Sequence, residues 1–184
     1  MKVKEMVLCG VLAAITAVCA QISIPTPFSP VPVTLQVLAV FLSAAVLGSR
    51  LGAISQIVYI SMGAIGLPVF AHFSGGLQIL TGITGGYLLS YPLAAYITGK
   101  IIEFNKNNND KATIIKNFLG MSMGLLVIYV LGCVQFSILT GNTITQSIVL
   151  TIVPFIIPDI IKILIASSLA LSLQKATKYS LSRG

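Results

Sequence analysis

Charged side chains are scarce in this sequence. Asp, Glu, Lys and Arg make up 8% of the 184 residues, whereas 56% are hydrophobic and the mean hydropathy is +1.00. A water-soluble domain usually carries about 25% charged residues, so the composition excludes that class. The chain is predicted to be an integral membrane protein. Each membrane span takes about 20 residues, so the length suits a single membrane domain over residues 1–184.

Motifs for catalysis and metal binding are missing as well. The sequence has no Walker A motif, no Gly-x-Ser-x-Gly, no His-Glu-x-x-His and no paired carboxylates. Its one histidine, His72, is expected to be a surface or cap residue, and its three cysteines lie in apolar runs without metal-ligand spacing. We expect neither an enzyme nor an ATPase, and no metal or cofactor. Nucleic acid is not an expected partner either, because no basic patch is interleaved with aromatic residues.

Long hydrophobic runs are what the sequence does contain, and they predict an all-α bundle of six transmembrane helices. A short apolar segment over residues 144–155 should precede the last helix, which is expected to begin at Pro158 because proline suits the first helical position. The six predicted spans cover approximately residues 5–24, 33–47, 51–67, 85–102, 118–139 and 158–175.

The basic residues are distributed unevenly among the predicted loops. The N-terminal end holds two, the turn after the second span one, the loop after the fourth span four and the C-terminus three, which accounts for ten of the eleven Lys and Arg residues. The loops after the first, third and fifth spans hold none. Cytoplasmic loops carry the excess of Lys and Arg in membrane proteins, so both termini are predicted to be cytoplasmic.

Two irregular segments are predicted at the outer face. Residues 23–32 contain four of the eight prolines and no charge, which predicts a stiff, extended cap. Residues 68–86 are rich in glycine. Inside a membrane, irregular backbone is tolerated only where protein buries it or a cavity wets it, so the glycine-rich segment is expected to line a cavity.

One acid and one base interrupt the last hydrophobic run. Asp159 and Lys162 are three residues apart, so on a helix they share one face. Ionised groups within a membrane span are costly and usually face a cavity or serve a function. Two interpretations are open: an ion pair that only fixes helix packing, or a ligand site. The ligand site is favoured, because an apolar pair could replace a purely structural ion pair.

Other polar and small residues are further candidates. Gln36 and Gln78 are predicted near the outer mouth, and Thr84, Gly85, Gly86 and Tyr87 could offer backbone amides, a hydroxyl and a ring to a ligand. Small residues recur along one side of the first span, which predicts close approach of another helix. That stripe consists of Gly10, Ala13, Ala14, Ala17 and Ala20.

Several motifs, in this order along the chain, resemble the BioY family, the biotin-specific S components of energy-coupling factor transporters. The resemblance covers nearly the whole chain. The motifs are Pro-Val-Pro-Val-Thr-Leu-Gln ending at Gln36, Gly-Leu-Pro-Val-Phe-Ala ending at Ala71, Ser74-Gly75-Gly76, Thr84-Gly85-Gly86-Tyr87-Leu88, and Pro158-Asp159 with Lys162.

The resemblance implies a multi-pass protein of the bacterial plasma membrane that captures biotin from outside. In such systems a transmembrane coupling protein (the T component) and two ABC-type ATPases supply the energy. The family's Ala-x-x-x-Ala contact motif for that partner matches Ala13 and Ala17.

Biotin's chemistry suits these residues. Its ureido ring has two N–H donors and a carbonyl acceptor, which Asp159 and Lys162 complement. Lys162 could instead hold the valerate carboxylate, with Gln78, Thr84 or loop amides sharing the remaining polar contacts. The apolar part of biotin would then be enclosed by Phe28, Phe70 and Tyr87. Two other functions stay open: an S component for another vitamin, and a self-sufficient secondary transporter with Asp159 as its proton site.

Overall fold

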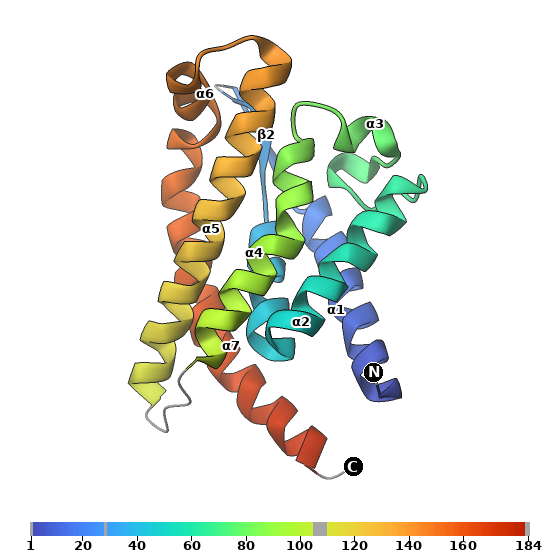
Figure 1. The fold of residues 1–184 in the computed structure, drawn as a ribbon, viewed down its shortest axis with the longest axis vertical. Coiled ribbons are helices and arrows are strands. Elements are labelled where there is room, and N and C mark those ends of the chain that lie inside the picture. Colours follow the sequence, from blue (N-terminus) through green and yellow to red (C-terminus); the bar gives the residue numbers. More distant parts are fainter. Residues whose placement is uncertain (1, 28, 105–109, 183–184) are drawn as a thin grey trace.

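The computed structural model describes residues 2–27, 29–104 and 110–182, with side chains described up to residue 174. Long helices dominate, as predicted, and the described part also contains one β-hairpin (Figure 1). The helices are α1 (Val3–Gln21), α2 (Gln36–Ala64), α3 (Leu77–Leu80), α4 (Gly85–Glu103), α5 (Asp110–Thr140), α6 (Ile144–Thr151) and α7 (Ile156–Ser182), with 3-10 turns η1 (Ala71–Phe73) and η2 (Val153–Phe155).

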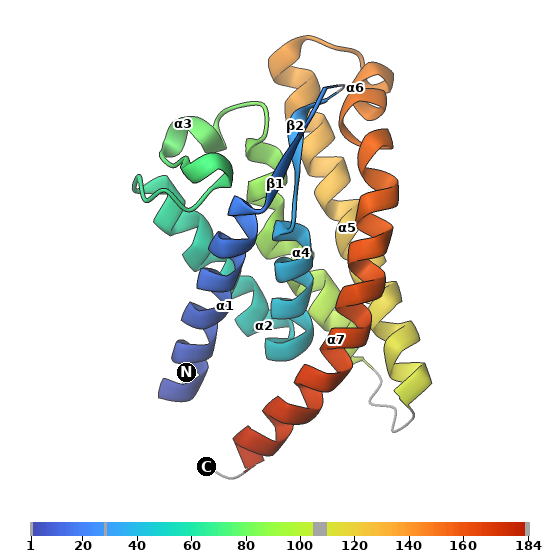
Figure 2. The same cartoon turned by 180° about the vertical axis from the view of Figure 1, so that it is seen from behind.

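Within the described residues, four helical segments are long and apolar enough to cross a membrane: Val3–Gln21, Gln36–Ala64, Asp110–Thr140 and Ile144–Gln174. The start of α1 and the last turn of α7 lie at the same end of the molecule, as Figures 1 and 2 show. A multi-pass membrane protein is therefore the class that the structure supports. The count of six spans and the cytoplasmic side of the termini stay predictions.

The predicted second and third spans form the single helix α2, which is broken at Gly48. Gly48 has φ 83° and ψ −177°, a region of backbone conformation that is essentially restricted to glycine. In Figure 1 the chain reverses here, so residues 36–47 and 49–64 form two arms. The carboxylate of Glu103, at the end of α4, accepts hydrogen bonds from the backbone N and Oγ of Ser49 at 2.7 and 2.8 Å. This contact caps the second arm in the way that an N-cap side chain would.

The proline-rich segment is extended, as predicted, but it pairs with itself. Strands β1 (Ser23–Thr26) and β2 (Ser29–Thr34) form an antiparallel hairpin in which Ser23 lies opposite Thr34. The fold is therefore mostly helical, with this hairpin as an addition to the predicted helical bundle. Prolines lack a backbone N–H donor, so the sequence argued against a helix but did not predict strand pairing. Pairing satisfies some of the backbone hydrogen-bonding groups, which are costly to leave unpaired near lipid.

The glycine-rich segment contains the 3-10 turn η1 and the short helix α3 before α4 begins. Phe70 bridges to Ser74 across η1, and the residues from Phe70 to Ser74 are hereafter called the 70–74 turn. The ring of Phe70 is buried against the ring of Tyr59, with their centroids 5.6 Å apart. A side chain at Gly63 would collide with the Phe70 ring, so glycine there makes room for it.

The last apolar region is divided as the sequence predicted. The short helix α6 and the turn η2 precede the long helix α7, which begins at Ile156. Pro158 is thus the third residue of α7 and not its first. Asp159 still lies in the first turn of α7, where the positive end of the helix dipole favours a carboxylate.

Candidate functional site

A cavity of about 340 Å³ lies between the hairpin, the 70–74 turn and helices α2, α4, α5 and α7. Small-ligand sites usually measure about 300–1,000 Å³ and are mostly apolar with a few aimed polar groups. The wall fits that description, because prolines, aliphatic side chains and aromatic rings form most of it. Its charged side chains are Asp159 and Lys162.

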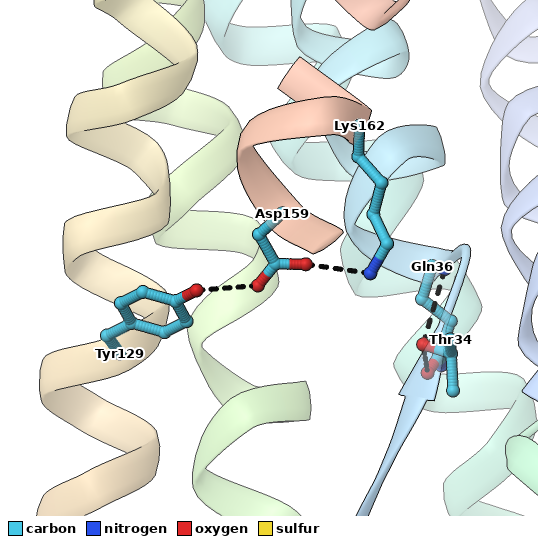
Figure 3. A network of polar contacts seen from close by, with 5 residues as sticks. All are labelled: Thr34, Gln36, Tyr129, Asp159 and Lys162. Atoms are coloured by element: carbon cyan, nitrogen blue, oxygen red, sulfur yellow. Dashed lines mark hydrogen bonds and ion pairs between the residues drawn. The ribbon is translucent and has the colours of Figure 1, made fainter. Parts of the chain in front are cut away.

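Asp159 and Lys162 form a buried ion pair in the cavity wall. Their residues are 3% and 6% exposed, and Lys162 Nζ lies 2.7 Å from Asp159 Oδ1. The hydroxyl of Tyr129 on α5 donates to the other carboxylate oxygen, Oδ2, at 2.7 Å. Figure 3 shows the carboxylate held between Tyr129 and Lys162. Each carboxylate oxygen therefore has one partner from within the chain.

The cluster keeps hydrogen-bonding capacity for a guest. An ammonium group has three N–H donors, and the Lys162 ammonium uses one of them on Asp159. An ionised carboxylate has about four acceptor positions, and Asp159 uses two of them. Donors and acceptors thus remain side by side at one place in a largely apolar cavity. This arrangement suits a small neutral group that both donates and accepts, or an anionic group on Lys162.

A second polar cluster joins the start of α2 to its neighbours. Thr34 Oγ1 donates to Gln36 Oε1 at 2.9 Å, and Gln36 Nε2 donates to the hydroxyl of Tyr59 at 2.6 Å. That hydroxyl donates in turn to the backbone oxygen of Val69 at 3.1 Å. Gln36 lines the cavity, but both ends of its amide are already bonded. Its main role is to fix the strand end, α2 and the segment that leads into the 70–74 turn.

Six of the predicted binding residues lie together at the cavity. Tyr87 is positioned by two contacts: its ring packs where Gly132 leaves space on α5, and its hydroxyl donates to Thr151 O at 3.4 Å. Thr84 stands just before α4 and makes no side-chain cap hydrogen bond to that helix. The six are Gln36, Phe70, Thr84, Tyr87, Asp159 and Lys162.

Other predicted binding residues lie elsewhere. Gln78 is exposed, does not line the cavity and donates to Gly75 O at 2.7 Å. Gly85 and Gly86 do not line the cavity either. Both are closely packed: a side chain at Gly85 would collide with Leu80 O, and one at Gly86 would collide with α5. These two glycines allow close packing, and their assignment as ligand contacts stays a prediction. Phe28 lies outside the described residues.

The predicted partner contact on α1 also changes. Ala13 is 0% exposed and belongs to the hydrophobic core, so its side chain packs inside the chain. Ala17 is half-buried and packs against the same core. On the neighbouring face, Gly10 and Ala14 are exposed. Ala13 therefore packs against this chain's own helices, and the contact of the small-residue stripe with a partner stays a prediction.

Sequence reasoning missed several residues of the wall. Tyr129 is the main one, since it lies in the middle of an apolar helix and no motif marks it. A tyrosine within a predicted span near an intramembrane acid was the available signal, because a buried hydroxyl needs a partner. The other missed wall residues include Thr34, Tyr91, Thr151 and Phe155.

The fold and the cavity define a multi-pass membrane protein that can enclose a small, mostly apolar molecule around one buried polar cluster. The chain matches the BioY family over residues 1–179 and belongs to that family. It is 39% identical to "Biotin transporter BioY" of Thermotoga maritima, over 94% of this chain and 96% of that protein. It is 41% identical to "Probable biotin transporter BioY" of Pyrococcus horikoshii, over 84% of this chain and 86% of that protein.

The fold is shared with a solved structure. The crystal structure of the S component for biotin from an ECF-type ABC transporter superposes with a TM-score of 0.83, covers 94% of this chain and 92% of its own, and is 24% identical in sequence. At that identity the likeness establishes the fold.

Proposed function

We propose that this protein is the biotin-binding S component of an ECF-type vitamin transporter, which captures biotin at the outer face of a bacterial plasma membrane. The observation that carries the proposal is the buried cluster of Asp159, Lys162 and Tyr129 in the wall of a ligand-sized cavity. Relatives over nearly the full chain are named as biotin transporters, which supports the choice of ligand.

Biotin's polar groups and its apolar parts both have matching side chains in the cavity wall. The free acceptor positions of Asp159 suit the ureido N–H groups, and the free donors of Lys162 suit either the ureido carbonyl or the valerate carboxylate. Phe70 and Tyr87 offer rings to the thiophane and alkyl parts. The two orientations differ in which end of biotin meets Lys162, so analogues that change one end distinguish them.

The energy for uptake is proposed to come from partners. The sequence contains no Walker A motif, so this chain would rely on a transmembrane coupling protein and two ABC-type ATPases. Binding and transport are then separate activities: the first belongs to this chain, and the second to the complex. A test of binding therefore needs only the purified chain.

The direct test is native mass spectrometry and calorimetry of the detergent-purified protein. One biotin per chain is expected, with thiamine and riboflavin failing to compete. Biotin methyl ester, which lacks the carboxylate charge, should lose affinity only if Lys162 holds the carboxylate. Binding of another vitamin in place of biotin would refute the proposal. Uptake driven by a pH gradient in liposomes containing this chain alone would instead support a secondary transporter.

A further inference from the structure

Gln21, the last residue of α1, binds both sides of the 70–74 turn with a single side chain. Its Nε2 donates to Phe70 O at 3.0 Å, and its Oε1 accepts from the backbone N of Phe73 at 2.9 Å. Nε2 also lies 3.3 Å from Ala17 O in the preceding turn of α1, which fixes the amide's orientation. The end of α1 is thereby tied to a segment about fifty residues further along the chain.

The turn that Gln21 holds is conformationally strained. His72 and Phe73 have φ of 57° and 53°, in the left-handed region that bulky L-residues rarely adopt. Such a conformation persists only where the surroundings hold it in place. On the inner side, the buried Phe70 ring anchors the turn against Tyr59. On the outer side, Gln21 bonds the backbone at both ends of η1.

The same turn is part of the cavity wall. Phe70, Ala71, His72 and Ser74 line the cavity, and with the hairpin they belong to the part of the wall that is not built from long helices. Asp159 and Lys162 are almost completely buried in another part of that wall. A ligand that contacts them shares the cavity with the turn, so movement of the turn would affect how fast the ligand leaves. The turn is suited to such movement because it is short and strained, and its side-chain hydrogen bonds to other elements are the two with Gln21 and a 3.4 Å contact between Ser23 Oγ and His72 Nε2.

We propose that Gln21 is a positioning residue for the ligand site, which holds the 70–74 turn against the cavity and so sets the rate at which a bound ligand leaves. The proposal rests on the proposed function, because biotin is the ligand that the turn would retain. Gln21 itself does not line the cavity. It acts through the turn, so its effect should fall on ligand release and on the mobility of the turn.

The test compares Gln21→Met and Gln21→Glu with the unmodified chain. Loss of two hydrogen bonds in Gln21→Met should speed dissociation of radiolabelled biotin about 5- to 20-fold. Gln21→Glu keeps an acceptor for Phe73 N but turns a carboxylate oxygen toward the acceptors Phe70 O and Ala17 O, so its dissociation should be at least as fast as that of Gln21→Met. Hydrogen exchange of the ligand-free protein should accelerate in Gln21→Met at residues 68–76, with the helices unchanged.

Gln146→Met is the matched control. Gln146 is exposed, caps the start of α6 through Thr143 and does not line the cavity. Biotin should therefore dissociate from Gln146→Met at the same rate as from the unmodified chain. Equal biotin release from Gln21→Met and the unmodified chain would overturn the proposal, as would faster exchange spread through the whole bundle. If the unmodified chain binds no biotin, the proposed function fails, whereas the exchange measurement still tests the link between Gln21 and the turn.

Discussion

Asp159 and Lys162 are a buried ion pair whose removal separates a packing role from a binding role. Replacing a buried ion pair by apolar side chains of similar size is often neutral or stabilising by about 1–4 kcal/mol, whereas removing one partner costs about 3–5 kcal/mol. The double variant Asp159→Leu with Lys162→Met should therefore melt at or above the temperature of the unmodified chain. Its biotin affinity should fall at least about 100-fold, because charged hydrogen bonds contribute about 1.5–3 kcal/mol each.

Thermal unfolding in detergent and biotin titration measure the two effects independently. The single variant Lys162→Met, which leaves Asp159 without its cation, should be less stable than the double variant. A double variant that binds biotin as well as the unmodified chain would show that the pair serves helix packing alone.

Tyr129 orients the carboxylate of Asp159, and its hydroxyl is the group to remove. Tyr129→Phe deletes the 2.7 Å hydrogen bond to Oδ2 and changes little else in side-chain volume. A hydrogen bond to an ionised group contributes about 1.5–3 kcal/mol, so biotin affinity should fall about 10- to 100-fold. Tyr96→Phe is the control, since Tyr96 is 39% exposed and does not line the cavity. Equal losses in both variants would contradict a specific role for Tyr129.

The sequence predicted the ion pair of the site but not its orientation or its third member. Two charges three residues apart in an apolar run can be located without a structure, because their spacing and their cost in lipid are local properties. Tyr129 comes from a different helix, and only the packing of α5 against α7 brings it to Asp159. The same limit explains Gln78 and Ala13, which have the expected residue type but point away from the expected surroundings.

At the scale of elements, the chain reversal at Gly48 joins two predicted spans into one element. The long apolar runs located both arms, and Gly48-Ser49-Arg50 marked the boundary between them. The contact with Glu103 was not evident, because it joins residues 54 positions apart. Boundaries set by local composition could thus be predicted, whereas the side chain that stabilises the boundary could not.

Gly48→Ala, at the break in α2, should lower the free energy of unfolding, whereas Gly10→Ala should not. A residue with a side chain pays about 1–3 kcal/mol to adopt such a backbone conformation, and the added Cβ would also collide with Glu103. Gly10→Ala on α1 is the matched control. Nothing lies within 4 Å of its added Cβ, so helix propensity should stabilise that variant by about 0.5–1 kcal/mol. Thermal unfolding of the two variants in the same detergent should give the lower melting temperature for Gly48→Ala. A lower melting temperature for Gly10→Ala would contradict the prediction.

At the scale of the whole molecule, α1 presents two different faces. Ala13 lies on the face buried in the core, and the exposed face carries Gly10 and Ala14 four residues apart. The 70–74 turn, which lines the cavity, meets α1 at Gln21, the C-terminal residue of that helix. A partner that packs on the exposed face would thus contact this chain without occupying the ligand site.

Ala14→Trp tests whether that exposed face serves the proposed coupling protein. Ala14 is exposed, so a larger side chain there can extend away from the core, and the variant should fold normally and bind biotin with unchanged affinity. Small residues allow helices to approach closely in membranes, and a tryptophan there should prevent the approach and abolish uptake by cells that express the complete transporter. Ala13→Trp should behave differently, because overpacking a fully buried position costs about 1–3 kcal/mol or more and should weaken folding and binding together. Normal uptake by Ala14→Trp, measured with radiolabelled biotin at matched expression, would place the partner on another surface of the chain.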